Sequence, residues 1–121
     1  MKKLSVALTA VILLAVAAFA ENESVSMTGE IVDLHCFTGS GPHAGLHGAD
    51  HAGCANACLT RDVPPGFLAD DGTLYLVVNE KMNSVKEKVA GKAGQKVTVT
   101  GKIVERSGMK VLQLATIGAV E

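Results

Sequence analysis

The residues best suited to chemistry are crowded into one short window of this 121-residue chain. All three cysteines and all four histidines occur between His35 and Cys58. Within that window His51, Cys54 and Cys58 are separated by three and then four residues, a spacing that places side chains on one face of a helix. Imidazole nitrogen and thiolate sulfur are donors that zinc and copper ions prefer. The window is therefore where we expect a metal site.

A fourth donor comes from the residue that ends the first predicted strand, Cys36. If that strand end reaches the helix face, the donors form a Cys₃His set, which matches the four-coordinate preference of Zn²⁺. Copper, particularly Cu(I), accepts fewer soft donors from the same cluster. The predicted ligands are Cys36, His51, Cys54 and Cys58.

The other histidines rank lower as ligands. His47 and His43 continue the spacing toward the N-terminus, but glycines at 45, 48 and 53 interrupt a continuous helix, so both are held in reserve. His35 ranks last, because neighbouring residues of a strand point to opposite faces and Cys36 already faces the site. The carboxylate of Asp33 is expected to orient a histidine or to end the strand.

The N-terminus predicts export. Lys2 and Lys3 precede an apolar run, and Ala18, Phe19 and Ala20 form the small-x-small pattern of a signal-peptidase site. Residues 1–20 are therefore interpreted as a signal peptide and residues 21–121 as one mature domain, periplasmic or secreted. Contact with a membrane is expected only through an uncleaved leader.

Export to an oxidising compartment leaves two other interpretations of the cysteines open. Three cysteines imply either three thiolates on a metal, or one disulfide and one free thiol. Cys54 and Cys58 should not bridge each other on a helix, because their Cβ atoms would lie about 5–6 Å apart against about 3.8 Å in a disulfide. A bridge from Cys36 would give a disulfide-stabilised interaction module without metal, and readily exchanging sulfurs would give a thiol redox protein.

Composition and motifs argue against several other classes. Without the two leader lysines the chain holds nine basic and twelve acidic residues, and its aromatic content is 3%. A nucleic-acid partner is therefore not expected. No phosphate-binding loop, nucleophile elbow or His-Glu-x-x-His motif occurs, so an enzyme is disfavoured, and a Cys54–His51 nucleophilic pair is the weaker interpretation.

The remaining segments are predicted to be mainly strands. Alternating apolar residues predict strands from residue 25 to 36, at 67–69 and 73–78 around Asp71-Gly72, and at 97–105 and 109–117. Glycines make 37–53 a loop, and 50–60 predicts a short helix capped by Asp50. Met82, Val85 and Val89 form the apolar stripe of a second helix of two to three turns that ends at Gly91.

A short internal repeat bears on how the strands bend. The pattern Thr-Gly-charged-Ile-Val-acid at residues 28–33 recurs at 100–105. The similarity is either chance or a sign that both strands need a glycine bend to coil around a small barrel. Five strands with a helix between the third and the fourth resemble the oligonucleotide/oligosaccharide-binding (OB) barrel. The predicted fold is a mainly β, five-stranded OB-like barrel with one or two short helices and a Cys/His-rich loop at 36–60.

The motifs also resemble a group of small exported bacterial OB-like proteins of uncharacterised function. The likeness spans roughly residues 28–78 and carries no activity. Its motifs are Val32-Asp33-x-x-Cys36, His51-x-x-Cys54-Ala55-x-x-Cys58, Pro65-x-Phe67 and Asp71-Gly72-Thr73-Leu74-Tyr75. The expected function follows instead from the leader and the Cys/His cluster: an exported small protein that binds zinc as a structural ion or copper as cargo.

Overall fold

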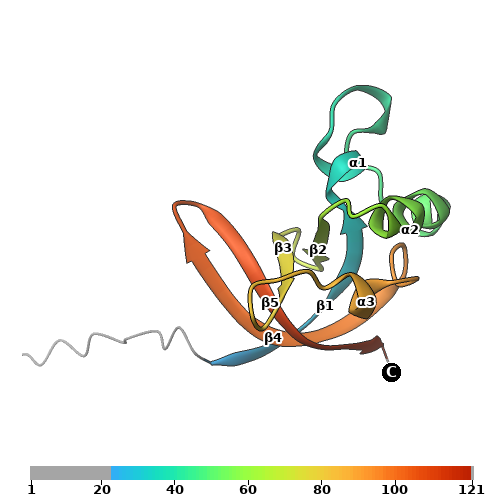
Figure 1. The fold of residues 1–121 in the computed structure, drawn as a ribbon. Helices are drawn as coiled ribbons and strands as arrows, with labels where there is room; N and C mark the ends of the chain where they lie inside the picture. The colour runs from blue at the N-terminus through green and yellow to red at the C-terminus, as the bar shows by residue number, and fades with distance from the viewer. Residues whose placement is uncertain (1–22, 121) are drawn as a thin grey trace, which may run out of the picture.

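Five strands close into a barrel in the computed structural model, which describes residues 23–120 (Figure 1). The predicted 1–20 leader lies outside the described residues. The barrel order is β1-β2-β3-β5-β4, and only the β3–β5 pair is parallel. This mixed barrel confirms the predicted mainly β, OB-like fold. The strands are β1 (Ser24–Asp33), β2 (Pro65–Ala69), β3 (Leu74–Asn79), β4 (Lys96–Arg106) and β5 (Met109–Ala119).

Most of the helical residues lie in the long connection between β1 and β2. This connection holds α1 (Leu34–Thr38), the 3₁₀ turns η1 (Gly41–His43) and η2 (Ala49–His51), and α2 (Ala52–Thr60). A one-turn helix, α3 (Lys86–Val89), connects β3 to β4. Figure 1 shows α1 and its loop projecting from the barrel, with α2 beside them. Among the described helices, none has the length and apolar character needed to cross a membrane.

The core fixes α2 to the barrel. Phe67, Val99 and Leu112 are fully buried inside the barrel, and Ala55 and Leu59 of α2 join the same apolar cluster. Burying a leucine side chain contributes about 1.5–3 kcal/mol relative to leaving it exposed. The face of α2 that carries Ala55 and Leu59 is therefore held against the barrel, and the remaining side chains of this helix are positioned by that packing.

The two glycines of the repeat, Gly29 and Gly101, lie where the structure leaves no room for a side chain, which supports the interpretation that both strands need glycine. A Cβ atom at Gly29 would overlap the carbonyl oxygen of Leu68, and one at Gly101 would overlap that of Gln113. The β4–β5 register also shifts between Thr100 and Gly101. Both positions therefore require glycine, because neighbouring backbone approaches too closely for a side chain.

The predicted helix at 82–91 is wrong in its first half. Asn79 accepts hydrogen bonds through Oδ1 from the backbone N–H groups of Lys81 (2.8 Å) and Asn83 (2.9 Å), which folds this segment into a turn. Met82 has a φ of 61° and is 53% exposed. Helical residues need negative φ, so the helix is confined to α3, while Val85 and Val89 are still buried as expected.

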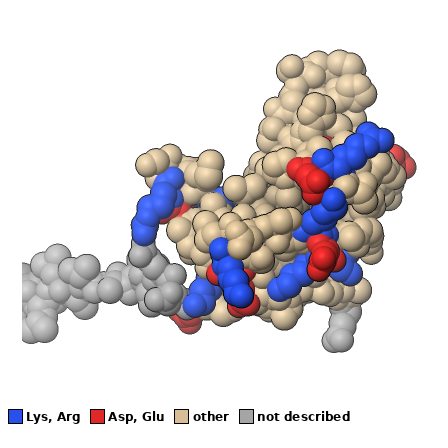
Figure 2. All heavy atoms as spheres, in the orientation of Figure 1, with Lys and Arg blue, Asp and Glu red and all other residues tan. Residues whose placement is uncertain are grey.

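Opposite charges from the two halves of the sequence pair across the fold. Residues 21–80 hold nine acids and one base, and residues 81–121 hold eight bases and three acids. Lys96 pairs with Asp70, and Lys86 Nζ lies 2.9 Å from Asp62 Oδ1. On the face seen in Figure 2 the basic and acidic side chains are interspersed rather than gathered into a patch of one sign. Charges of the acidic half of the sequence therefore pair with charges of the basic half within the fold.

Candidate metal centre

Asp33 fixes the position of Cys36, the first candidate ligand. It is the last residue of β1 and the N-cap of α1, and its Oδ1 accepts a hydrogen bond from the backbone N–H of Cys36 at 2.8 Å. Cys36 was expected on the strand itself. That expectation is wrong, because the side chain of Asp33 caps a helical turn and stops the strand three residues earlier. Cys36 is 6% exposed.

The other three candidate ligands come from η2 and α2. The helix begins at Ala52 rather than after Asp50, which makes no capping bond, so the predicted Asp50 cap is wrong. A 3₁₀ turn over Ala49–His51 starts this segment instead and directs His51 toward β1. The Nε2 atom of His51 lies 3.2 Å from Oδ2 of Asp33, as expected if Asp33 orients a histidine.

Three sulfurs converge between α1 and α2. The Sγ atoms of Cys36, Cys54 and Cys58 all lie within 4.8 Å of one another, and all three are free thiols. Sulfurs bound to one tetrahedral Zn²⁺, each about 2.3 Å from the ion, lie about 3.8 Å apart. Small side-chain rotations would therefore bring the three sulfurs onto a single ion. The predicted proximity of the Cys36 thiol to the thiol pair of α2 is confirmed.

A second donor group shares Cys36. One donor atom from each of Asp33, Cys36 and His51 also lies within 4.8 Å of the others. Asp33 is fully buried, and His51 has only 9% of its surface exposed. The 3.2 Å between the imidazole and the carboxylate is a long hydrogen bond, and it is close to the roughly 3.3 Å that separates nitrogen and oxygen ligands on one tetrahedral zinc ion. Asp33 and His51 therefore lie beside Cys36 but do not belong to the three-sulfur group, so the predicted Cys₃His set is divided into two groups that share Cys36.

Negative charge is unfavourable in this cluster when no cation is present. Burial, followed by the charge of Asp33, raises the pKa of Cys36 to about 12. Burial, again followed by Asp33, raises the pKa of Cys58, and Arg61 opposes that shift. The thiols of Cys36 and Cys58 are therefore neutral near pH 7, and a bound cation would supply the positive charge that thiolates need at these positions.

The remaining histidines lie outside both donor groups. His47 Nδ1 lies 3.1 Å from Glu30 Oε2, and its ring packs edge-on against Phe37 with 6.0 Å between centroids. His43 is exposed on η1, and His35 is exposed on α1. In this structure, His47 and His43 are therefore not brought to the sulfurs. The projecting segment that carries them, 34–49, contains no Lys, Arg, Asp or Glu, and Figure 2 shows its surface as uncharged.

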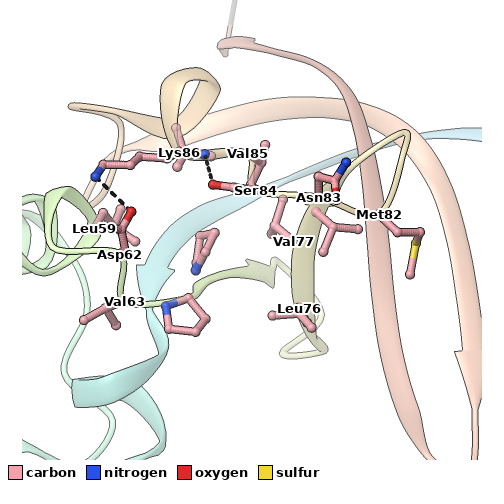
Figure 3. A pocket seen from close by; sticks show the side chains of 14 residues that line it. Leu59, Asp62, Val63, Leu76, Val77, Met82, Asn83, Ser84, Val85 and Lys86 are labelled. Atoms are coloured by element: carbon pink, nitrogen blue, oxygen red, sulfur yellow. Dashed lines mark hydrogen bonds and ion pairs between the residues drawn. The ribbon is translucent and has the colours of Figure 1, made fainter.

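An apolar pocket of about 340 Å³ lies apart from the cysteines, between β3 and the 82–86 segment. Figure 3 shows the Lys86–Asp62 ion pair at its rim and Leu76 and Val77 on its β3 side. None of the candidate ligands lines it. Its volume falls within the range of small-ligand pockets, and the polar residues of its lining are Asp62, Asn83, Ser84 and Lys86.

No protein-family model, curated protein or solved structure matches this chain. The barrel and the cysteine cluster that the resemblance implied are both present, and the comparisons identify no family. Asp33 was expected to orient a histidine or to end the strand, and it does end β1, but it was missed as a possible donor, although its place three residues before Cys36 was a signal for a capping carboxylate.

Proposed function

We propose that this protein binds one zinc or copper ion through Cys36, Cys54 and Cys58, with His51 as the fourth ligand. The observation that carries the proposal is the convergence of three sulfurs within 4.8 Å from two separate helices. Both helices are fixed, since Asp33 caps α1 and Leu59 anchors α2 in the core. Thiolate-rich sites select Zn²⁺ and Cu(I) over harder cations such as Mg²⁺.

The need for a fourth ligand distinguishes Zn²⁺ from Cu(I) at this site. Zn²⁺ requires a fourth donor, and His51 and Asp33 are the neighbouring groups that can supply one. Cu(I) is held adequately by three thiolates, so its site would leave the Asp33–His51 contact intact. Replacing His51 should therefore weaken Zn²⁺ binding strongly and Cu(I) binding much less.

The test begins with protein purified without chelator or nickel affinity resin and kept reduced. Elemental analysis should find one thiophilic ion per chain. Competition titration with a chromophoric chelator then gives the affinities of the apoprotein for Zn²⁺ and for Cu(I). The Cys54→Ser variant should lose most of this affinity, because it removes one sulfur of the trio.

The matched control is Ala57→Ser, which introduces a hydroxyl at a half-buried position of the same helix without removing a thiol. It should bind metal like the original protein. Equal metal content and thermal stability in Cys54→Ser and Ala57→Ser would contradict the proposal. Both variants are checked by circular dichroism, so that loss of the fold is distinguished from loss of a ligand.

Export is part of the proposed function. The leader pattern at residues 1–20 supports cleavage after Ala20 and a periplasmic or secreted protein. Fractionation of cells that express the full chain, followed by intact-mass measurement, should recover a species that starts at Glu21 outside the cytoplasm. Recovery of the uncleaved chain in the cytoplasm would contradict this part of the proposal.

A further inference from the structure

The three cysteines of the cluster differ in how far each residue is exposed to solvent. Cys54 is exposed, Cys58 is half-buried, and Cys36 is 6% exposed. An external reagent therefore meets Cys54 first. Its distance from Cys36, within 4.8 Å, means that a reaction at Cys54 places the modified sulfur directly beside a second thiol.

Helix geometry decides which second thiol can close a disulfide. Cys54 and Cys58 are both on α2, four residues apart, where Cβ atoms lie about 5–6 Å from each other. A disulfide needs Cβ atoms about 3.8 Å apart. Cys36 is on α1, a five-residue helix in a separate segment, so its side chain approaches Cys54 without breaking the hydrogen bonds of α2.

We propose that Cys54 reacts with external disulfides and that Cys36 resolves the product, which ejects the bound ion. This inference rests on the proposed function, because the ion is held by the same sulfurs. The substrate class is a disulfide of a small molecule or of a protein. The site thereby acts as a metal store that opens when disulfides accumulate.

The chemistry balances in two exchanges. The Cys54 sulfur, as thiolate, attacks the external disulfide, forms a mixed disulfide and releases one external thiolate. The Cys36 thiolate then attacks the Cys54 sulfur, forms the Cys36–Cys54 disulfide and releases the second external thiolate. The external disulfide is reduced by two electrons and the protein is oxidised by two. Cys58 stays reduced, and one sulfur no longer suffices to hold the ion.

The experiment uses the zinc-loaded full-length protein and glutathione disulfide as the probe. A zinc-sensitive dye follows ion release, and mass spectrometry of a non-reduced digest maps the linkage. We expect zinc release to accompany a Cys36–Cys54 disulfide, with Cys58 still open to alkylation. A Cys54–Cys58 or Cys36–Cys58 linkage, or no reaction, would overturn the proposal.

Variants separate the two exchanges. Cys36→Ser should stop at glutathione attached to Cys54, whereas Cys58→Ser should still form the Cys36–Cys54 disulfide. Ala57→Ser is the matched control on α2 and should behave like the original protein. Resolution of the mixed disulfide in Cys36→Ser would overturn the assignment of Cys36.

The outcomes for the two proposals are distinguishable. Zinc binding to the reduced protein is measured first, without glutathione disulfide, and the exchange is also run on the apoprotein. Stoichiometric zinc with no disulfide formation would refute the exchange and leave the metal site standing. Disulfide formation in a protein that never binds zinc would refute the metal site.

Discussion

Asp33 is the residue that joins the barrel to the candidate metal centre. One carboxylate oxygen accepts from the backbone of Cys36, and the other lies 3.2 Å from the ring of His51. The side chain is fully buried, so its charge must be paired. A single carboxylate thus fixes the positions of two predicted ligands, one on each side of the site.

Replacing Asp33 with Asn should weaken metal binding more than it weakens the fold. Asn is as good an N-cap as Asp, so α1 is retained. With its oxygen on the Cys36 N–H, however, its amide nitrogen would face His51 and cannot accept a hydrogen bond from the ring. Loss of a carboxylate that orients a ligand typically lowers metal affinity about 10- to 100-fold. Competition titration should show this loss, and Asp50→Asn, on an exposed acid of η2, should leave affinity unchanged. Equal affinities in the two variants would refute the role of Asp33.

The histidines give a second prediction at the residue scale. His51→Ala should lower Zn²⁺ affinity, because it removes a donor adjacent to Cys36. His43→Ala should leave it unchanged, because His43 is exposed on η1 and belongs to neither donor group. Zn²⁺ titration of both variants provides the measurement. A comparable loss in His43→Ala would mean that the η1 loop closes onto the ion.

The cysteine and histidine positions were largely predictable at the residue scale. Spacing alone selected His51, Cys54 and Cys58, because positions three and four apart on a helix share a face. The local structure around Cys36 was not predictable from alternation, since the alternating apolar pattern continues through it. The capping bond from Asp33 to the backbone three residues later is a local interaction that apolar alternation does not reveal, and it overrides that pattern.

Among the elements, the bent strands make the closed barrel possible. Gly29 on β1 and Gly101 on β4 lie where neighbouring backbone leaves no room for a Cβ atom. The repeated Thr-Gly pattern left open whether the likeness was chance or a shared need for glycine, and the close backbone at both positions supports the need for glycine. Turn chemistry at Asp71-Gly72 predicted the β2–β3 hairpin. The helix at 82–91 was overestimated because apolar spacing carries no information on the Asn79 side chain, which holds the turn.

Gly101→Ala should therefore destabilise the domain. The added methyl group would overlap the carbonyl oxygen of Gln113 on β5, and overpacking of this kind costs about 1–3 kcal/mol. The control is Gly118→Ala on β5, where a Cβ atom meets nothing within 4 Å, and it should change stability by less than about 0.5 kcal/mol. Chemical denaturation measures both. Equal stabilities would contradict the requirement for a glycine bend.

At the scale of the whole molecule, ion pairs join the acidic and basic halves of the sequence. Asp70 accepts hydrogen bonds from Lys96 and from Thr28. These two bonds lower the pKa of Asp70 below the ordinary 3.8, and the bond from Lys96 is the larger cause. A carboxyl whose pKa is lower in the folded state stabilises the protein above its unfolded pKa. That contribution is lost as the pH falls from 3.8 through the lower folded value.

Asp70→Asn should accordingly be less stable than the original protein near neutral pH, and the difference should shrink as the solution is acidified below 3.8. Denaturation midpoints of both proteins across this range provide the measurement. Lys96→Gln should remove most of the pH-dependent difference, because Lys96 is the stronger donor. A difference that stays constant with pH would contradict the ion pair as its source.

If one ion is bound by sulfur from both helices, as proposed, X-ray absorption at the metal edge will show those sulfurs as its neighbours. The zinc-loaded, reduced protein should show three sulfur scatterers at about 2.3 Å and one nitrogen or oxygen at about 2.0 Å. Cys36→Ser should show two sulfurs. A first shell of nitrogen and oxygen alone, or a sulfur count that does not change in Cys36→Ser, would contradict the account.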